Sequence, residues 1–402
     1  MVEASTREGS AADAIDGVVP RQIVEPDTAS GLAATLQRAS RDRLVTVLRG
    51  GGTKLGWGRQ PRPIDLLVST ARLNSLLVHR HGDLTATVHA GVTLAQLNRE
   101  LARHRQWLPV DSAFDEATIG GIVATNDSGP LRHRHGTPRD LLIGVTLALA
   151  DGRLVKAGGH VVKNVAGYDL GKLVSGSFGS LAAIVDATFK LFPLPQASAT
   201  LDAGYRDVEA MARDASLIAA SQLEPCAFDV SFEGHYRLLV RFASSPAAVK
   251  AQVESAQRML SPVSSLVSGD REAAIWTDHV RSSWVGTGAV VRVGWLPAKL
   301  AELTTLVRDV QQITAGGITI AGRVGIGTGL FRLDADLRAQ AAALERLRSS
   351  VWVGNVAVLR ASQELKAGTD VWGPPGSAIA VARALKQTFD PAGILNAERG
   401  PV

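Results

Sequence analysis

The feature that most constrains this chain is a set of three glycine-rich segments in its first half. The first follows a short strand-like run at residues 44–48 and reads Arg49, Gly50, Gly51, Gly52, Thr53 and Lys54. Because glycine has no Cβ, the N–H groups of such a loop can approach a phosphate closely. The segment lacks Walker A spacing, and no G-x-G-x-x-G opens a helix after a strand. It therefore indicates a phosphate-binding loop of another type, or simply a flexible turn.

The second and third segments allow the same two interpretations. In residues 117–126, apolar residues lie on both sides of Gly120 and Gly121. Such a segment can present main-chain donors to a diphosphate in a cavity wall from which water is excluded. A tight turn before a buried helix explains the pattern equally well. Residues 158–170, followed by residues 175–179, are typical of a loop that lines a ligand. Composition alone does not name that ligand.

Length, charge and cysteine content narrow the functional classes. A chain of 402 residues can form two or three domains. A net charge of +5, spread without a dense basic stripe, argues against nucleic-acid binding and fits an anionic ligand such as a dinucleotide or a small carboxylate. The single cysteine, Cys226, cannot hold an Fe–S cluster or form an internal disulfide, so we expect it to be a small buried residue.

The N-terminus and the apolar runs bear on localisation. Residues 1–18 are polar and are predicted to form a disordered tail without signal-peptide features. The longest apolar run, residues 141–150, has about half of the ~20 residues needed to span a bilayer. We expect a cytoplasmic protein that meets a membrane only through partner subunits.

Hydrophobic patterning predicts an α+β fold with a C-terminal return. A first domain covers residues 19–196 and ends where Pro193 and Pro195 stop a strand. Residues 197–375 alternate as βαββα and then βαββαβ, which predicts a duplicated ferredoxin-like unit with an irregular stretch at 261–288 between its halves. Residues 376–402 carry a last helix and an extended tail.

Five segments occur in the order of a known family. Residues 49–54, 117–121, 163–170, 176–179 and 389–396 resemble the PCMH-type FAD-binding domain shared by vanillyl-alcohol oxidase, D-lactate dehydrogenase and glycolate oxidase. The third and fourth segments resemble most closely the FAD-binding subunit of bacterial glycolate oxidases. The resemblance is dense over residues 20–195 and returns at the end of the chain.

The resemblance implies FAD as cofactor and a set of residues that hold it. Main-chain N–H groups of residues 50–54 and 118–121 should bind the diphosphate, and Ile184 or Val185 should pack on the adenosine end. Because residues 50–54 contain no histidine, FAD should be bound non-covalently. The implied cofactor-binding residues are Arg49, Gly50, Gly51, Gly52, Thr53, Lys54, Pro109, Asp111, Thr118, Ile119, Gly120, Gly121, Ala124, Asn126, Gly129, Gly179, Ile184 and Asn396.

The second half departs from hydroxy-acid-oxidising relatives. Those relatives have an H-x-G-D-G-N-x-H stretch in this half of the chain. Its first histidine, aspartate, asparagine and last histidine correspond here to Arg323, Ile326, Thr328 and Leu330. Arginine stays protonated and neither accepts a proton nor binds a metal, and leucine can do neither. We therefore expect no metal site and leave the catalytic residues unassigned.

Other polar clusters carry weaker hypotheses. The basic run Arg132, His133, Arg134 and His135 could meet a phosphate or a substrate carboxylate, or form a solvated loop. His79, His81 and His89 lack metal-ligand spacing, and Ser175 and Ser177 lie in no G-x-S-x-G elbow.

The resemblance implies an electron-transferring or assembly subunit of a glycolate oxidase complex. Such a complex has a catalytic FAD subunit and an iron–sulfur subunit, and it acts on a small 2-hydroxy acid. The alternatives are a stand-alone FAD-dependent 2-hydroxy-acid dehydrogenase, in which Arg323 or Arg132 binds the carboxylate, and a flavin-free scaffold.

Overall fold

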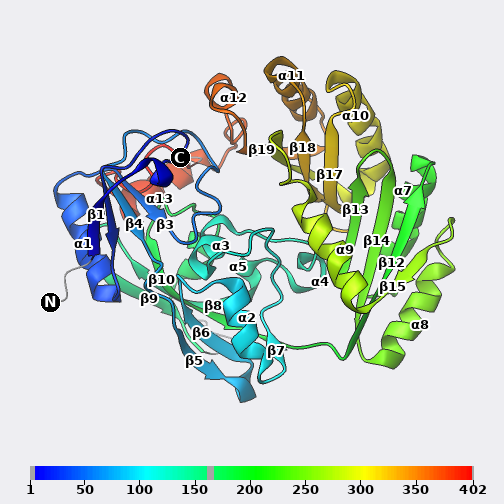
Figure 1. Cartoon of the computed structure of the whole chain (residues 1–402), viewed down its shortest axis with the longest axis horizontal. Coiled ribbons are helices and arrows are strands. Elements are labelled where there is room, and N and C mark those ends of the chain that lie inside the picture. The colour runs from blue at the N-terminus through cyan, green and yellow to red at the C-terminus, as the bar shows by residue number, and fades with distance from the viewer. Residues whose placement is uncertain (1–4, 161–166, 401–402) are drawn as a thin grey trace. The chain divides into compact units, whose positions relative to one another are not determined.

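The computed structural model describes residues 5–160 and 167–400 and divides the chain into two compact units. The first comprises Met1–Ser128, Gly136–Leu194 and Pro375–Val402, and the second comprises Gly129–His135 and Pro195–Pro374. Both units combine helices with sheets, which confirms the α+β class (Figure 1).

The first unit contains two main sheets. A four-stranded sheet has the order β1-β2-β4-β3, and a five-stranded antiparallel sheet has the order β5-β6-β10-β8-β9. The sequence of residues 146–156 predicts a hairpin, because strand-like runs flank Asp151 and Gly152. The structure confirms it between β8 and β9, with Gly152 in the left-handed region at φ +86°. The elements of this unit are β1 Ser5–Glu8, η1 Ala11–Asp13, β2 Gln22–Glu25, α1 Ala29–Arg41, β3 Thr46–Arg49, β4 Leu66–Ser69, β5 Leu76–Arg80, η2 His81–Asp83, β6 Thr85–His89, α2 Leu94–Ala102, β7 Gln106–Trp107, α3 Ile119–Thr125, α5 Pro138–Leu141, β8 Leu142–Ala148, β9 Leu154–Gly158, α6 Leu170–Val174, β10 Ala183–Lys190, β11 Phe192–Pro193 and α13 Ile379–Phe389.

The expectation of a disordered N-terminal tail is wrong for residues 5–18. Strand β1 pairs antiparallel with β2, from Ser5 opposite Glu25 to Glu8 opposite Gln22. The buried carboxylate of Asp13 accepts hydrogen bonds from the guanidinium group of Arg7 at 2.8 Å. Main-chain pairing and this ion pair order a polar segment that has no apolar stripe for sequence patterning to detect.

The second unit is built on one eight-stranded antiparallel sheet with the order β15-β12-β14-β13-β17-β18-β16-β19. Each half of the sheet has four strands. Numbered along the chain within each half, these strands lie in the order 4-1-3-2 across the sheet. The two halves therefore share one topology, which confirms the ferredoxin-like duplication. Its elements are α4 Arg132–His135, β12 Ala197–Tyr205, α7 Val208–Ala219, β13 Ala227–Phe232, β14 Tyr236–Ser244, α8 Pro246–Gln257, β15 Ser265–Val267, α9 Gly269–Ser282, β16 Ala289–Trp295, η3 Pro297–Lys299, α10 Leu300–Ile313, β17 Ile318–Arg323, β18 Thr328–Leu333, α11 Leu337–Arg348, β19 Val353–Arg360 and α12 Gln363–Gly368.

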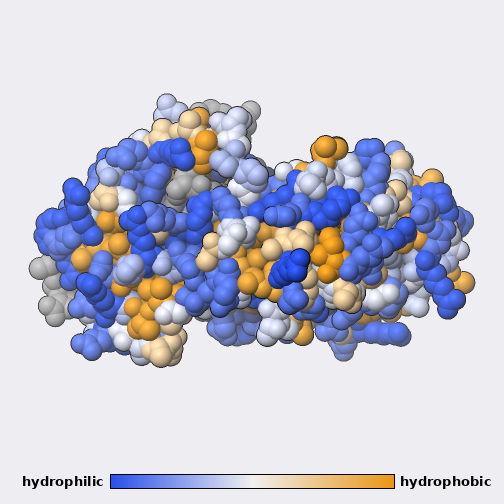
Figure 2. All heavy atoms as spheres, turned by 90° about the horizontal axis from the view of Figure 1, so that it is seen from above, coloured by the Kyte–Doolittle hydropathy of each residue, from blue (hydrophilic) through white to orange (hydrophobic). Residues whose placement is uncertain are grey.

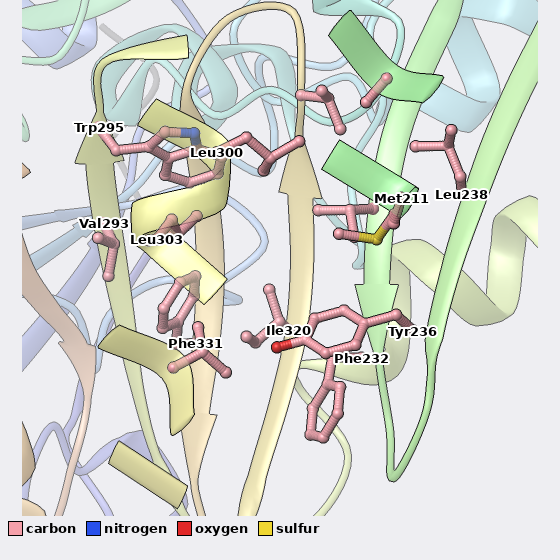
Figure 3. Packing of buried hydrophobic residues seen from close by; sticks show 14 of the residues in the cluster. Met211, Phe232, Tyr236, Leu238, Val293, Trp295, Leu300, Leu303, Ile320 and Phe331 are labelled. Atoms are coloured by element: carbon pink, nitrogen blue, oxygen red, sulfur yellow. The ribbon is translucent and has the colours of Figure 1, made fainter. Parts of the chain in front are cut away.

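One apolar core joins the two halves of this sheet to helices α7, α8, α10 and α11. Figure 3 shows Leu300 and Leu303 of α10 beside Trp295 and Phe331, which project from neighbouring strands. Burying a side chain of this size contributes roughly 1.5–3 kcal/mol. The core therefore holds the sheet as a rigid platform whose opposite face is free for polar residues.

That opposite face carries helix α9, which lies in the stretch that we expected to be irregular. Its buried residues include Glu272, Trp276 and His279. The Glu272 carboxylate accepts hydrogen bonds from the hydroxyl of Thr200 at 2.8 Å and from Nε of Arg241 at 3.0 Å. Polar contacts hold this helix in place, and for that reason hydrophobic periodicity did not predict it.

In the described part of the chain, none of the helices combines the length and apolar character that a membrane crossing requires. The face drawn in Figure 2 carries apolar residues in patches between hydrophilic ones.

Candidate functional site

The first unit contains a cavity with an empty volume of about 840 Å³, its open mouth included. Most of the predicted cofactor residues line it, namely Arg49, Gly50, Gly51, Gly52, Thr53, Lys54, Thr118, Gly120, Gly121, Ala124, Gly179, Ile184 and Asn396. Described residues that we predicted but that are not part of this lining are Pro109, Asp111, Ile119, Asn126 and Gly129, the last of which belongs to the second unit.

The loop of residues 50–54 leaves the end of β3 with its main-chain donors unused. Among the described residues, no acceptor takes the N–H of Gly50, Gly51, Gly52, Thr53 or Lys54. A Cβ on Gly51 would overlap the carbonyl oxygen of Glu116, and Gly52 has φ +76°. Successive free N–H groups in such a turn form an anion-binding concavity. The loop therefore has the geometry expected of a diphosphate cradle.

The segment at the start of α3 differs from our expectation. The N–H of Ile119 donates to the carbonyl of Val92 and that of Gly120 to the carbonyl of Ala90, each at 2.8 Å. These two donors are therefore not available to a phosphate, and the predicted role of their N–H groups is wrong. Gly120 serves packing instead, because a Cβ there would lie 2.8 Å from the Cβ of Ala90. The N–H of Gly121 is only weakly engaged, 3.4 Å from the Thr118 hydroxyl, and no acceptor among the described residues takes the N–H of Thr118.

The C-terminal segment contributes Asn396 and Arg399 to the cavity wall. The Asn396 N–H donates to the carbonyl of Thr46 at 2.8 Å, its Nδ2 donates to the carbonyl of Phe178, and its buried Oδ1 has no partner in the described part of the chain. Lys386 holds this segment through Nζ, which lies 2.6 Å from the Asp390 carboxylate. The predicted closing motif thus lies against β3.

Sequence reasoning missed Arg399. Its guanidinium donates to the carbonyl oxygens of Leu55 and Trp57, and burial lowers its pKa although Asp16 opposes that shift. Arg49, in contrast, was predicted to bind the cofactor but directs its Nη1 to Asp13 at 3.0 Å. The buried positive charge of the cavity therefore comes from Lys54, which was predicted, and from Arg399, which was not.

These features fit FAD. The unused donors of residues 50–54 suit a diphosphate. Asn396 Oδ1 and Lys54 Nζ make no hydrogen bond within the described part of the chain and offer further polar contacts to an elongated ligand. Apolar wall residues such as Phe178, Ala182 and Ile184 suit its aromatic ends. Of the predicted segment at residues 163–170, residues 163–166 lie outside the described residues.

The stretch that departs from hydroxy-acid-oxidising relatives forms the hairpin of β17 and β18 in the second unit. Arg323 lies opposite Asp229 of β13, with Nε 3.8 Å from the carboxylate. His279 of α9 places Nε2 2.8 Å from the same carboxylate, whose side chain is 0% exposed. Arg323 and the near imidazole nitrogen of His279 are thus both directed at Asp229. His279 carried no sequence signal because α9 itself was not predicted, and Asp229 lies within strand β13, where the sequence pattern marks no functional residue.

The basic run at residues 132–135 lies in the second unit as helix α4. His133 packs edge-on against Phe228, with ring centroids 5.9 Å apart, and Arg134 forms an ion pair with Glu224 at 3.1 Å. Burial lowers the pKa of His133 and lowers that of His135 to about 4. The interpretation as a solvated loop is therefore wrong for the two histidines, which are uncharged at neutral pH.

The histidines of the first unit cluster in space without forming a metal site. His81 and His104 stack with ring centroids 4.7 Å apart, and His79 Nε2 donates to Gln106 Oε1 at 2.8 Å. Within residues 5–160 and 167–400, no group of histidine, cysteine or acidic side chains is arranged to hold a metal ion.

Replacing the buried carboxylate of the second unit should destabilise it strongly. Asp229→Ala leaves Arg323 buried without its counter-ion, which costs about 3–5 kcal/mol of unfolding free energy. Denaturant unfolding followed by tryptophan emission measures the loss. The matched control is Asp309→Ala, which breaks a half-exposed pair with Arg346 in the same unit and should cost about 0–1 kcal/mol. Equal costs for the two variants would contradict the structural role assigned to Asp229.

Comparisons with known proteins also indicate FAD as the ligand. Residues 20–158 match the family described as FAD binding domain. The chain is 33% identical to glycolate oxidase subunit GlcD of Bacillus subtilis over 212 residues, 52% of this chain and 45% of that protein. It is 32% identical to glycolate oxidase subunit GlcE of Escherichia coli over 238 residues, 57% of this chain and 65% of that protein.

A D-lactate dehydrogenase of Archaeoglobus fulgidus is 37% identical over 171 residues, 42% of this chain and 38% of that protein. The chain thus aligns with less than two thirds of each of these relatives. Among solved structures, a chitooligosaccharide oxidase superposes with a TM-score of 0.73 at 16% identity, covering 99% of this chain and 97% of that one. This likeness shows the fold alone.

Proposed function

We propose that this chain is an FAD-binding oxidoreductase subunit of a glycolate oxidase complex. Residues 20–158 match an FAD binding domain, and relatives named as glycolate oxidase subunits are similar to about half of the chain. One observation carries the proposal. The loop after β3 lines a cavity and carries a run of main-chain N–H groups that no acceptor among the described residues takes.

In this proposal, the N–H groups of residues 50–54 and of Gly121 bind the diphosphate of FAD. Ile184 packs on the adenosine end, and Asn396 and Arg399 close the cavity from the C-terminal segment. FAD supplies the redox chemistry when it is bound, and the protein excludes water and sets the local charge.

The chain acts with partners rather than alone. Its only cysteine, Cys226, is buried, so electrons that leave the flavin need an iron–sulfur protein outside this chain. The relatives named as glycolate oxidase subunits support a catalytic FAD subunit as a second partner. We propose a small 2-hydroxy acid as substrate of the assembled complex, and a cytoplasmic location with membrane contact only through the partners.

A pull-down of the tagged chain from its native cell, with mass spectrometry of the captured proteins, tests the complex. Recovery of a second FAD-linked oxidase and a cysteine-rich iron–sulfur protein supports the proposal. Recovery of neither, together with full glycolate turnover by the chain itself, would favour the stand-alone dehydrogenase.

The purified protein should be yellow, and its flavin should be released by acid. The loop of residues 50–54 offers N–H groups but no histidine. In many members of the family that this chain resembles, a histidine near this loop links FAD covalently. After precipitation with trichloroacetic acid, the absorbance near 450 nm should be recovered in the supernatant. Colour retained in the protein pellet would show a covalent link, and a colourless protein that takes up no FAD would favour the scaffold.

A further inference from the structure

Lys54 is a buried cation in the wall of the proposed FAD cavity. Its side chain is 5% exposed, and Nζ lies 5.3 Å from the centroid of the Phe114 ring and 5.9 Å from that of Trp57. Burying an ammonium group is costly unless charge and hydrogen bonds compensate for the lost water. Cation–π contacts supply only part of that compensation.

The remaining compensation comes from Asp127. Its Oδ2 lies 3.1 Å from Lys54 Nζ and 3.3 Å from the hydroxyl of Ser112. This pair lies at the far end of the glycine loop, on residues that are distant in sequence but belong to the same unit. Lys54 thus brings a positive charge to the cavity wall, and Asp127, which is not part of the lining, holds a negative charge 3.1 Å from it.

The hydrogen-bonding capacity of Lys54 is not used within the protein. Among the described residues, Nζ makes no hydrogen bond of acceptable geometry, although it pairs electrostatically with Asp127. A buried ammonium group in a cavity wall, with donors to spare, indicates a bound ligand that supplies acceptors.

We propose that Lys54 and Asp127 together set the reduction potential of the bound flavin. This inference rests on the proposed function as an FAD protein. Reduction adds negative charge to the flavin, so a nearby buried cation stabilises the reduced form and a nearby carboxylate opposes it. Lys54 raises the potential, and Asp127 cancels part of that effect.

Two single substitutions should shift the potential in opposite directions. Lys54→Met removes the cation with little change in side-chain length and should lower the midpoint potential. Asp127→Asn keeps the shape of the carboxylate and removes its charge, so it should raise the potential. The double variant should lie between the two. The measurement is an anaerobic spectroelectrochemical titration of each full-length holoprotein against a reference dye.

Lys172→Met is the matched control, because Lys172 forms an exposed pair with Asp169 in the same unit and should leave the potential unchanged. If Lys54→Met fails to retain FAD, Asp127→Asn alone decides the question, since it keeps the cation. An unchanged potential in Asp127→Asn, or shifts of the same sign in both variants, would overturn the inference and assign Lys54 to diphosphate binding. A wild-type protein that binds no FAD would instead refute the proposed function.

Discussion

Gly121→Val is expected to abolish FAD binding while the protein stays folded. A Cβ at this position would meet only the Thr118 hydroxyl, at 3.4 Å, which is an ordinary van der Waals contact. The added methyl groups extend into the cavity and keep a phosphate away from the Gly121 N–H and the neighbouring loop. Loss of two charge-assisted hydrogen bonds, at about 1.5–3 kcal/mol each, weakens FAD binding by roughly 10²-fold or more.

The measurement is the flavin content of the purified variant, followed by titration of the apoprotein with FAD. Gly204→Val is the control, because Gly204 lies in the second unit and has open space around it. Gly51 is a poorer site for this test, since a side chain there would overlap the backbone of residue 116 and distort the loop itself. Full flavin occupancy in Gly121→Val, with an unchanged circular dichroism spectrum, would refute the placement of the diphosphate.

The isolated holoprotein is expected to oxidise glycolate and D-lactate about 10²–10⁴-fold more slowly than the complete complex, the factor that a general base typically contributes. The hairpin of β17 and β18 offers no side chain that accepts a proton. Arg323 is directed toward Asp229, and the imidazole that shares this carboxylate belongs to His279, a buried residue of α9.

Dye-linked oxidation of both acids is measured with the chain alone and after addition of the candidate catalytic subunit. The reference value is the rate of the catalytic subunit without this chain. If the isolated chain matches the complex, it is a stand-alone dehydrogenase, and a buried group such as His279 must then become accessible during turnover.

Local sequence was sufficient for the features that depend on backbone conformation. The glycine loop after β3 and the turn at Gly152 need residues without a Cβ, and both were predicted from composition alone. The duplicated order of strands and helices in the second unit also followed from periodicity, because its core face is continuously apolar. The order of the five segments that resemble the PCMH-type FAD-binding domain then indicated the family and its cofactor.

Contacts between distant segments decided the rest. The N–H groups of residues 119 and 120 donate to the carbonyl groups of residues 92 and 90. No pattern in residues 117–126 predicts these partners. Helix α9, the Asp229–His279 pair and Arg399 share this property, since each is held by polar groups from elsewhere in the chain. Hydrophobic periodicity records burial of apolar faces, whereas hydrogen bonds and ion pairs of this kind exist only once the tertiary structure has brought their partners within about 3 Å of each other.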